Sequence, residues 1–151
     1  MAKINIFLDS SALIAGIISP LGAARALLLL GEDEKIRITV SEQIITEVER
    51  NLARKVPQAL PFARELILRS NIRIGRDPQI EDVSLHQDWI SHLADVPVLV
   101  AAVQAQVDFL ATLNTRHFMA DPEVSRRSGL RIGTPGDALA WVRGQLAKPV
   151  E

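Results

Sequence analysis

The side chains of this sequence that could do chemistry are mostly carboxylates. Asp9 and Asn114 each follow an apolar segment, and Asp95 precedes the Val-Pro pair that opens an apolar helical pattern. Another helical pattern carries Glu47 and Glu49 on the two flanks of its apolar arc, so periodicity does not choose between them. Oxygen ligands without cysteine or a paired-histidine motif suit a hard divalent ion, Mg²⁺ or Mn²⁺, rather than Zn²⁺. A cation would also offset the repulsion between clustered carboxylates.

Each of these residues also has a purely structural interpretation. Aspartate after a strand often caps the next helix, and for Asp9 capping explains the sequence about as well as chemistry does. Asp95 would cap the following helix, because a proline lies in the first turn of that helix. Thr112 and Asn114 could form a turn, and either glutamate could lie on a solvated helix flank. These alternatives stay open at this point.

Hydrophobic patterns predict five short strands that alternate with helices. The predicted strands are 3–8, 36–40, 72–74, 107–112 and 130–132. The predicted helices are 12–18, 23–30, 42–56, 57–70, 84–93, 96–106 and 135–146, and 76–82 is a predicted loop. This alternation predicts a three-layer, doubly wound α/β domain with a five-stranded parallel sheet, over residues 1–147, and a short tail at 148–151. Ligands of such sheets bind beyond the carboxyl ends of the strands, where Asp9 and Asn114 would lie.

Composition narrows the class of protein. The chain has 151 residues and a formal net charge of −1, which argues against a protein that coats nucleic acid through bulk charge, although a local basic patch remains open. The absence of cysteine excludes a disulfide scaffold, a thiolate zinc site and a catalytic thiol. No apolar segment reaches the ~20 residues of a membrane helix, and no secretory signal pattern is present. From these features we expect a cytoplasmic protein without a membrane segment.

Four segments of the sequence resemble, in order, the four sequence blocks of the PIN domain. They are FLDSSALIAGIISPLGAARALL, VSEQIITEVERNL, ADVPVLVAA and VDFLATLNTRHF, which together span nearly the whole chain. More narrowly, the segments look like the PIN-domain ribonucleases that include VapC-type toxins. The resemblance implies site acids at Asp9, at Glu47 rather than Glu49, and at Asp95. Its fourth position falls on Asn114, where many members have aspartate and some have asparagine.

The resemblance implies a metal-dependent endoribonuclease that hydrolyses RNA phosphodiester bonds. The four residues would be both catalytic and metal-binding, with Mg²⁺ or Mn²⁺ as the cofactor, and the hydroxyls of Ser11 and Thr112 would support the acids. RNA would be the substrate, and the protein would be the toxin of a toxin–antitoxin pair, with a protein antitoxin as partner and a homodimer as the assembly. Arg116 and His117, beside the fourth position, are candidate RNA contacts.

The three histidines do not predict a metal site. His86 and His92 are six residues apart, about 240° around a helix, so they would face different directions. We therefore assign structural or solvated roles to both. For His117, packing under Phe118 is a better explanation than contact with RNA phosphate. The basic cluster of Arg50, Arg54 and Lys55 could contact phosphate, but solvated helix faces produce the same pattern.

Two other readings compete with an active ribonuclease. A degenerate PIN-like domain would bind RNA or protein without cutting, and the uncharged Asn114 makes this alternative conceivable, whereas the three retained carboxylates favour activity. An unrelated doubly wound domain is the other. A phosphotransfer receiver needs a lysine that ends a late strand, and this chain has none between Lys55 and Lys148. A haloacid-type phosphatase needs an aspartate two residues after the first, where Ser11 stands.

Overall fold

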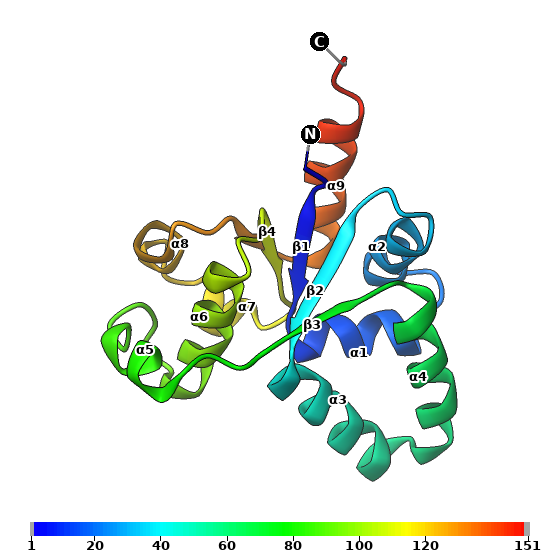
Figure 1. Cartoon of the computed structure of the whole chain (residues 1–151), viewed down its shortest axis with the longest axis horizontal. Coiled ribbons are helices and arrows are strands. Elements are labelled where there is room, and N and C mark those ends of the chain that lie inside the picture. Colours follow the sequence, from blue (N-terminus) through cyan, green and yellow to red (C-terminus); the bar gives the residue numbers. More distant parts are fainter. Residues whose placement is uncertain (1, 150–151) are drawn as a thin grey trace.

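The protein folds around a sheet of five parallel strands. In this computed structural model, which describes residues 2–149, the strand order is β3-β2-β1-β4-β5 (Figure 1). The strands are β1 (Asn5–Leu8), β2 (Arg37–Ser41), β3 (Arg73–Gly75), β4 (Phe109–Ala111) and β5 (Ile132–Gly133). Every pairing in the sheet is parallel. The predicted doubly wound α/β fold is therefore confirmed.

Helices cover both faces of this sheet. One side carries α1 (Ser10–Ile18), α2 (Ala23–Glu32), α4 (Leu60–Arg69) and α9 (Pro135–Leu146), and the other carries α5 (Ile80–Leu85), α6 (Val96–Gln104) and α8 (Glu123–Ser128) (Figure 1). The remaining helices are α3 (Glu42–Lys55), which continues from β2, α7 (Thr115–Phe118), which follows β4, and the short 3₁₀ helices η1 (Pro57–Ala59) and η2 (Leu93–Asp95). The two α-helical layers and the sheet make the three layers of the fold.

The central strand β1 explains why the site lies where it does. All four of its residues are buried, because helices cover both faces of the sheet. Ile6, Phe7 and Leu8 are at most 1% exposed and belong to the main hydrophobic core. The strand ends in this core, and Asp9 is the first residue beyond it. The next polar side chain of the chain is thus held at the carboxyl edge of the sheet.

Polar caps fix where the helices begin. The hydroxyl of Ser41 accepts a hydrogen bond from the Ile44 N–H, so Ser41 caps α3. Thr134 and Asp137 form a capping box at the start of α9, with Pro135 in its first turn. The predicted bounds of this last helix, 135–146, match α9. The predicted tail follows it, and its residues 150 and 151 lie outside the described residues.

Several predicted elements that follow α3 are wrong. The predicted helix 84–93 is replaced by α5, which begins earlier, at Ile80, and by turns that follow it. Glu81 and Asp82 lie in the first turn of α5, and acidic residues at this position are a sequence signal for the start of a helix. The short helices α7 and α8 were not predicted, because four to six residues carry too little periodic pattern. The predicted helix 57–70 is divided into η1 and α4, with Pro61 in the first turn of α4.

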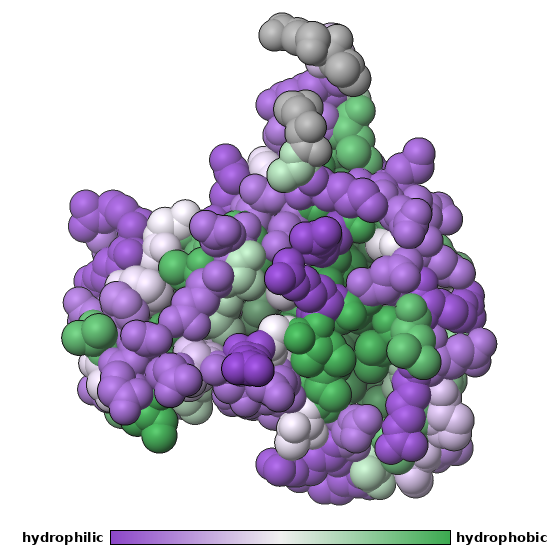
Figure 2. Space-filling model, in the orientation of Figure 1, coloured by the Kyte–Doolittle hydropathy of each residue, from purple (hydrophilic) through white to green (hydrophobic). Residues whose placement is uncertain are grey.

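The surface carries a few exposed apolar side chains. Within residues 2–149 no single helix has both the length and the apolar composition of a membrane span. The pair α1 and α2 has both when the two helices are taken together, but an 87° bend separates them. Figure 2 shows an apolar area over β3 and α4, surrounded by hydrophilic residues. The exposed large apolar residues of these two elements are Phe62, Leu68 and Ile74.

Candidate active site

The carboxyl ends of β1 and β4 bring Asp9 and Thr112 together. The strands pair from Ile6 with Phe109 to Leu8 with Ala111, and the backbone N–H of Asp9 donates to the Ala111 carbonyl at 3.2 Å. Thr112 is the next residue and is fully buried. The parallel register therefore places two polar side chains side by side at one edge of the sheet.

Asp9 is held by three donors. Its Oδ1 accepts hydrogen bonds from the Ser11 hydroxyl at 2.6 Å and from the Ala12 N–H at 2.9 Å, and its Oδ2 accepts one from the Thr112 hydroxyl. The hydrogen bond from Ala12 caps α1, so the prediction that Asp9 caps a helix is confirmed. Capping uses only one of the oxygens. The three bonds fix the orientation of the whole carboxylate.

Burial disfavours the ionised form of Asp9. The residue is 6% exposed, and this burial raises the pKa of its carboxyl above the usual 3.8. The hydrogen bonds from Ser11, Thr112 and Ala12 act in the opposite direction, and the negative charge of Asp95 raises the pKa further. A cation bound by Asp9 and Asp95 would stabilise both charges.

The raised pKa predicts how Asp9 affects stability in the absence of metal. Protonation favours the folded state, so the destabilising contribution of Asp9 is absent below pH 3.8, grows as pH rises through the raised pKa, and is then constant. In chelator at neutral pH, Asp9→Asn should therefore unfold at a higher temperature than the unmodified protein. The gain should shrink as pH is lowered. Thermal unfolding across pH measures it, with the exposed Asp88→Asn as control, and a gain independent of pH would contradict the argument.

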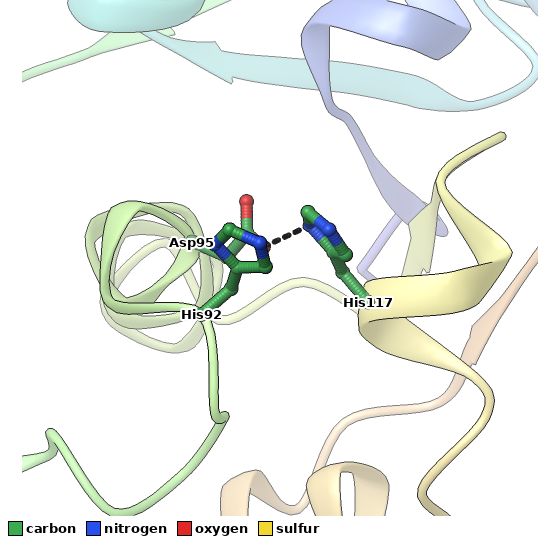
Figure 3. A group of neighbouring side chains, drawn as sticks. All are labelled: His92, Asp95 and His117. Atoms are coloured by element: carbon green, nitrogen blue, oxygen red, sulfur yellow. Dashed lines mark hydrogen bonds and ion pairs between the residues drawn. The ribbon is translucent and has the colours of Figure 1, made fainter.

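Asp95 does not act as a helix cap. It stands at the junction of η2 and α6, but its side chain accepts no hydrogen bond from the backbone of α6. Its Oδ2 instead lies 2.7 Å from Nδ1 of His117, and the Asp95 side chain is 17% exposed (Figure 3). The prediction that Asp95 caps the next helix is therefore wrong for its side chain, although the helix boundary is correct.

Asn114 links the two halves of the site. Its backbone N–H donates to the Thr112 hydroxyl at 2.9 Å, and its Oδ1 caps α7 by accepting from the His117 N–H at 3.4 Å. Its Nδ2 lies 2.9 Å from Nδ1 of His117. A continuous network therefore runs from Asp9 through Thr112 and Asn114 to His117 and Asp95.

His117 corrects the prediction that it packs under Phe118. Phe118 is buried in the core, whereas the His117 side chain is 26% exposed and contacts Asp95 and Asn114. Its ring also stacks on His92, with ring centroids 3.7 Å apart. The reason is the unpredicted turn of α7, which carries His117 back over Asn114. His92, assigned a structural or solvated role from the sequence, lies beside this network.

Glu47 and Glu49 lie in different surroundings on α3. Glu49 is 42% exposed at its side chain and forms an ion pair with Arg64 at 3.4 Å. Glu47 is half-buried and accepts a hydrogen bond from the Gln43 amide at 2.9 Å. It also lines a pocket of about 240 Å³ together with Ser10, the residue after Asp9. Among the described residues no hydrogen bond joins Glu47 to the network of Asp9.

A larger pocket lies elsewhere. Its volume is about 270 Å³, and it is lined by β2, β3 and the C-terminal end of α6. None of the four predicted acid-site residues contributes to it. Pocket size therefore does not mark this site; the marks are buried carboxylates at a strand end and the hydrogen bonds that orient them.

The donor set of the acids fits a hard divalent cation. Asp9, Glu47 and Asp95 offer carboxylate oxygens, which Mg²⁺ and Mn²⁺ prefer. Within residues 2–149 none of the three forms an ion pair with lysine or arginine, and the one titratable partner is the imidazole of His117 at Asp95. Carboxylates that lack a basic partner are costly unless a cation neutralises them.

Solved structures share this fold. The structure of PAE2754 from Pyrobaculum aerophilum has a TM-score of 0.62 and 18% sequence identity, with 94% of this chain and 97% of that chain covered. The structure of VapC20 from Mycobacterium tuberculosis, described as a toxin that cleaves the sarcin-ricin loop, has a TM-score of 0.54 and 14% identity, with 73% and 90% covered. A search of curated proteins gave no match.

The family comparison agrees with the fold. A family model described as PIN domain matches residues 5–116, from the first residue of β1 to the start of α7. The matched range contains Asp9, Glu47, Asp95 and Asn114. Because this match covers well over half of the sequence, the chain belongs to the PIN domain family.

Proposed function

We propose that this protein is a metal-dependent endoribonuclease that hydrolyses RNA phosphodiester bonds. The observation that carries the proposal is Asp9, a buried carboxylate ordered by hydroxyl donors and without a lysine or arginine partner among the described residues. The hydrogen-bond network through Thr112, Asn114 and His117 connects it to Asp95. Membership of the PIN domain family and the resemblance of the four sequence blocks support the same activity.

The residues of the chain have distinct parts in this proposal. Bound Mg²⁺ or Mn²⁺ would polarise the phosphoryl group and lower the pKa of a water molecule. Asp9, Glu47 and Asp95 would hold the ion, and Asn114 would contribute its carbonyl oxygen directly or through water. The three donors to Asp9 leave one lone pair of Oδ2 free, so the carboxylate is already oriented when the cation arrives. No side-chain nucleophile is needed.

Basic side chains flank the acids on two elements. Arg50 and Arg54 of α3 line the pocket that contains Glu47, and the exposed Arg116 follows Asn114 on α7. Phosphate oxygens of RNA are bound mostly by such side chains. We assign the contacts with RNA backbone to these arginines and to His117. They would align the strand so that one phosphodiester reaches the acids.

The cellular role belongs to the same proposal. We infer a cytoplasmic toxin of a toxin–antitoxin pair, inhibited by a protein antitoxin and assembled as a homodimer. The fold shared with VapC20, a cleaving toxin, supports this role. The apolar area over β3 and α4 in Figure 2, with Leu68 and Ile74 exposed, offers a surface for the second copy.

The test is RNA cleavage by the purified protein with and without metal. We expect endonucleolytic cleavage in Mg²⁺ or Mn²⁺, loss of cleavage to background in chelator, and recovery when either ion is restored. Fragment sizes on denaturing gels distinguish internal cutting from shortening at the ends. Cleavage that persists in chelator would contradict the metal dependence.

A second function is favoured by one observation. Asn114 carries no charge, and its amide is occupied as the cap of α7 and in contact with His117. A PIN-like domain that binds RNA or protein without cutting would tolerate this asparagine. RNA binding without cleavage in Mg²⁺, Mn²⁺ or both would favour this function over the first.

A further inference from the structure

Three side chains distant in sequence converge beside the acids. His92 precedes η2, Asp95 ends it, and His117 comes from α7; the three point toward one another (Figure 3). One ligand atom from each can be chosen so that all three lie within 4.8 Å of one another. Because residues i and i+3 align in a 3₁₀ helix, η2 places His92 and Asp95 on the same side.

Hydrogen bonds alone do not satisfy the Nδ1 atom of His117. It lies 2.7 Å from a carboxylate oxygen of Asp95 and 2.9 Å from the amide nitrogen of Asn114. A protonated Nδ1 would donate to Asp95 but then face the N–H donors of Asn114. An unprotonated Nδ1 would accept from Asn114 but then face the lone pairs of Asp95. Either arrangement leaves one unfavourable contact. In the first, Nδ1 donates to Asp95 and Nε2 of His117 keeps the free lone pair that a metal ion needs.

The side chain of His92 is free to become a ligand. It is exposed, it stacks on His117 at an interplanar angle of 29°, and among the described residues no hydrogen bond holds its ring. A metal ion must lie close to the plane of each imidazole that binds it, so the stacked rings have to turn apart on binding. The exposed His92 can make this turn while His117 keeps its contacts with Asp95.

We propose that His92, Asp95 and His117 form a second metal site, which binds a transition-metal ion such as Zn²⁺. Two imidazoles and one carboxylate are a ligand set of catalytic zinc sites, in which the fourth position stays open for water or substrate. Imidazole nitrogen favours zinc over the hard ions that suit an all-oxygen site. The sequence has no paired-histidine motif on one helix, whereas His92 and His117 come from two different elements.

This site goes beyond the proposed function, with which it shares Asp95 as a metal ligand and His117 as a residue assigned to RNA contact. Asp9 and its donors Ser11 and Thr112 contact neither His92 nor the ring of His117 through any hydrogen bond in the described residues. Asp95 would be a ligand in both metal sites, whereas the two histidines would be ligands only in the new one. The histidines therefore distinguish the new site from the acids.

Titration of the full chain with Co²⁺ tests the site directly. Co²⁺ in a four-coordinate site with imidazole ligands absorbs visible light strongly, whereas six-coordinate Co²⁺ on oxygen ligands absorbs weakly. We expect strong absorption at one equivalent of Co²⁺ and its loss when Zn²⁺ is added. His92→Ala and His117→Ala should each weaken Co²⁺ binding by at least about tenfold, because each removes one of three ligands.

His86 supplies the matched control, since it is the third histidine of the chain and stacks on Trp89 away from Asp95. His86→Gln should show the same strong Co²⁺ absorption as the unmodified protein. Circular dichroism checks folding, and the exposed His92 gives a variant that should fold even where His117→Ala does not. Strong absorption that survives in His92→Ala, or no absorption in the unmodified protein, would overturn the site. If the unmodified protein binds Co²⁺ as expected but does not cleave RNA, that result would count against the proposed function alone.

Discussion

Asp9→Asn should lower the rate of RNA cleavage by at least about 100-fold and leave the protein folded. Asp9 combines the deepest burial with the most ordered carboxylate of the site. Loss of an outer-shell partner of a metal ligand typically costs about 10–100-fold, so loss of the charged ligand itself should cost more. Single-turnover cleavage of a labelled RNA in Mg²⁺ measures the rate.

The isosteric change keeps this prediction specific. Asparagine retains a carbonyl oxygen for the Ala12 N–H, so the start of α1 should be preserved, and the neutral side chain removes the cost of a buried charge. Loss of activity together with equal or higher stability would separate a ligand from a structural residue. Asp88→Asn, at an exposed position, should cleave at the normal rate. An Asp9→Asn protein that cleaves normally would show that Asp9 serves only as a cap.

The fold could be predicted because its strongest signals are local. β1 is an apolar segment long enough to indicate a buried strand, and the alternation of such segments with helical patterns limits the topology to a parallel sheet. The position of Asp9 could be predicted from the same apolar segment, because the first polar residue after a buried strand must lie at the sheet edge. Short elements such as α7 could not be predicted, because its four residues are too few to show a periodic pattern.

The parts of the site that could not be predicted depend on contacts between distant elements. Periodicity placed Glu47 and Glu49 on opposite flanks of one apolar arc, and only the packing of α3 against α1 and α4 distinguishes their surroundings. His117 is 22 residues from Asp95 in the sequence, and their contact exists because α7 turns back toward η2. His92 was paired with His86 along a helix that does not form. No spacing rule within one element would have found the histidine cluster.

Glu47→Gln should lower the cleavage rate by at least about 100-fold, and Glu49→Gln should leave it within about twofold of normal. The two variants make the same chemical change two residues apart on one helix. Glutamine at 47 keeps the carbonyl oxygen that accepts from Gln43, so only the charge beside Ser10 is lost. Metal titration by calorimetry should show weaker Mn²⁺ binding for Glu47→Gln alone.

Glu49→Gln removes an ion pair with Arg64 whose side chains are 42% and 61% exposed. An exposed pair of this kind contributes about 0–1 kcal/mol, so the unfolding midpoint should change little. Normal cleavage by both variants would show that neither Glu47 nor Glu49 takes part. Loss of activity in Glu49→Gln with normal cleavage by Glu47→Gln would move the second acid to Glu49. In that case α3 would have to turn about its axis when RNA binds, since Glu49 is now held by Arg64 of α4 while Glu47 lies in the pocket beside Ser10.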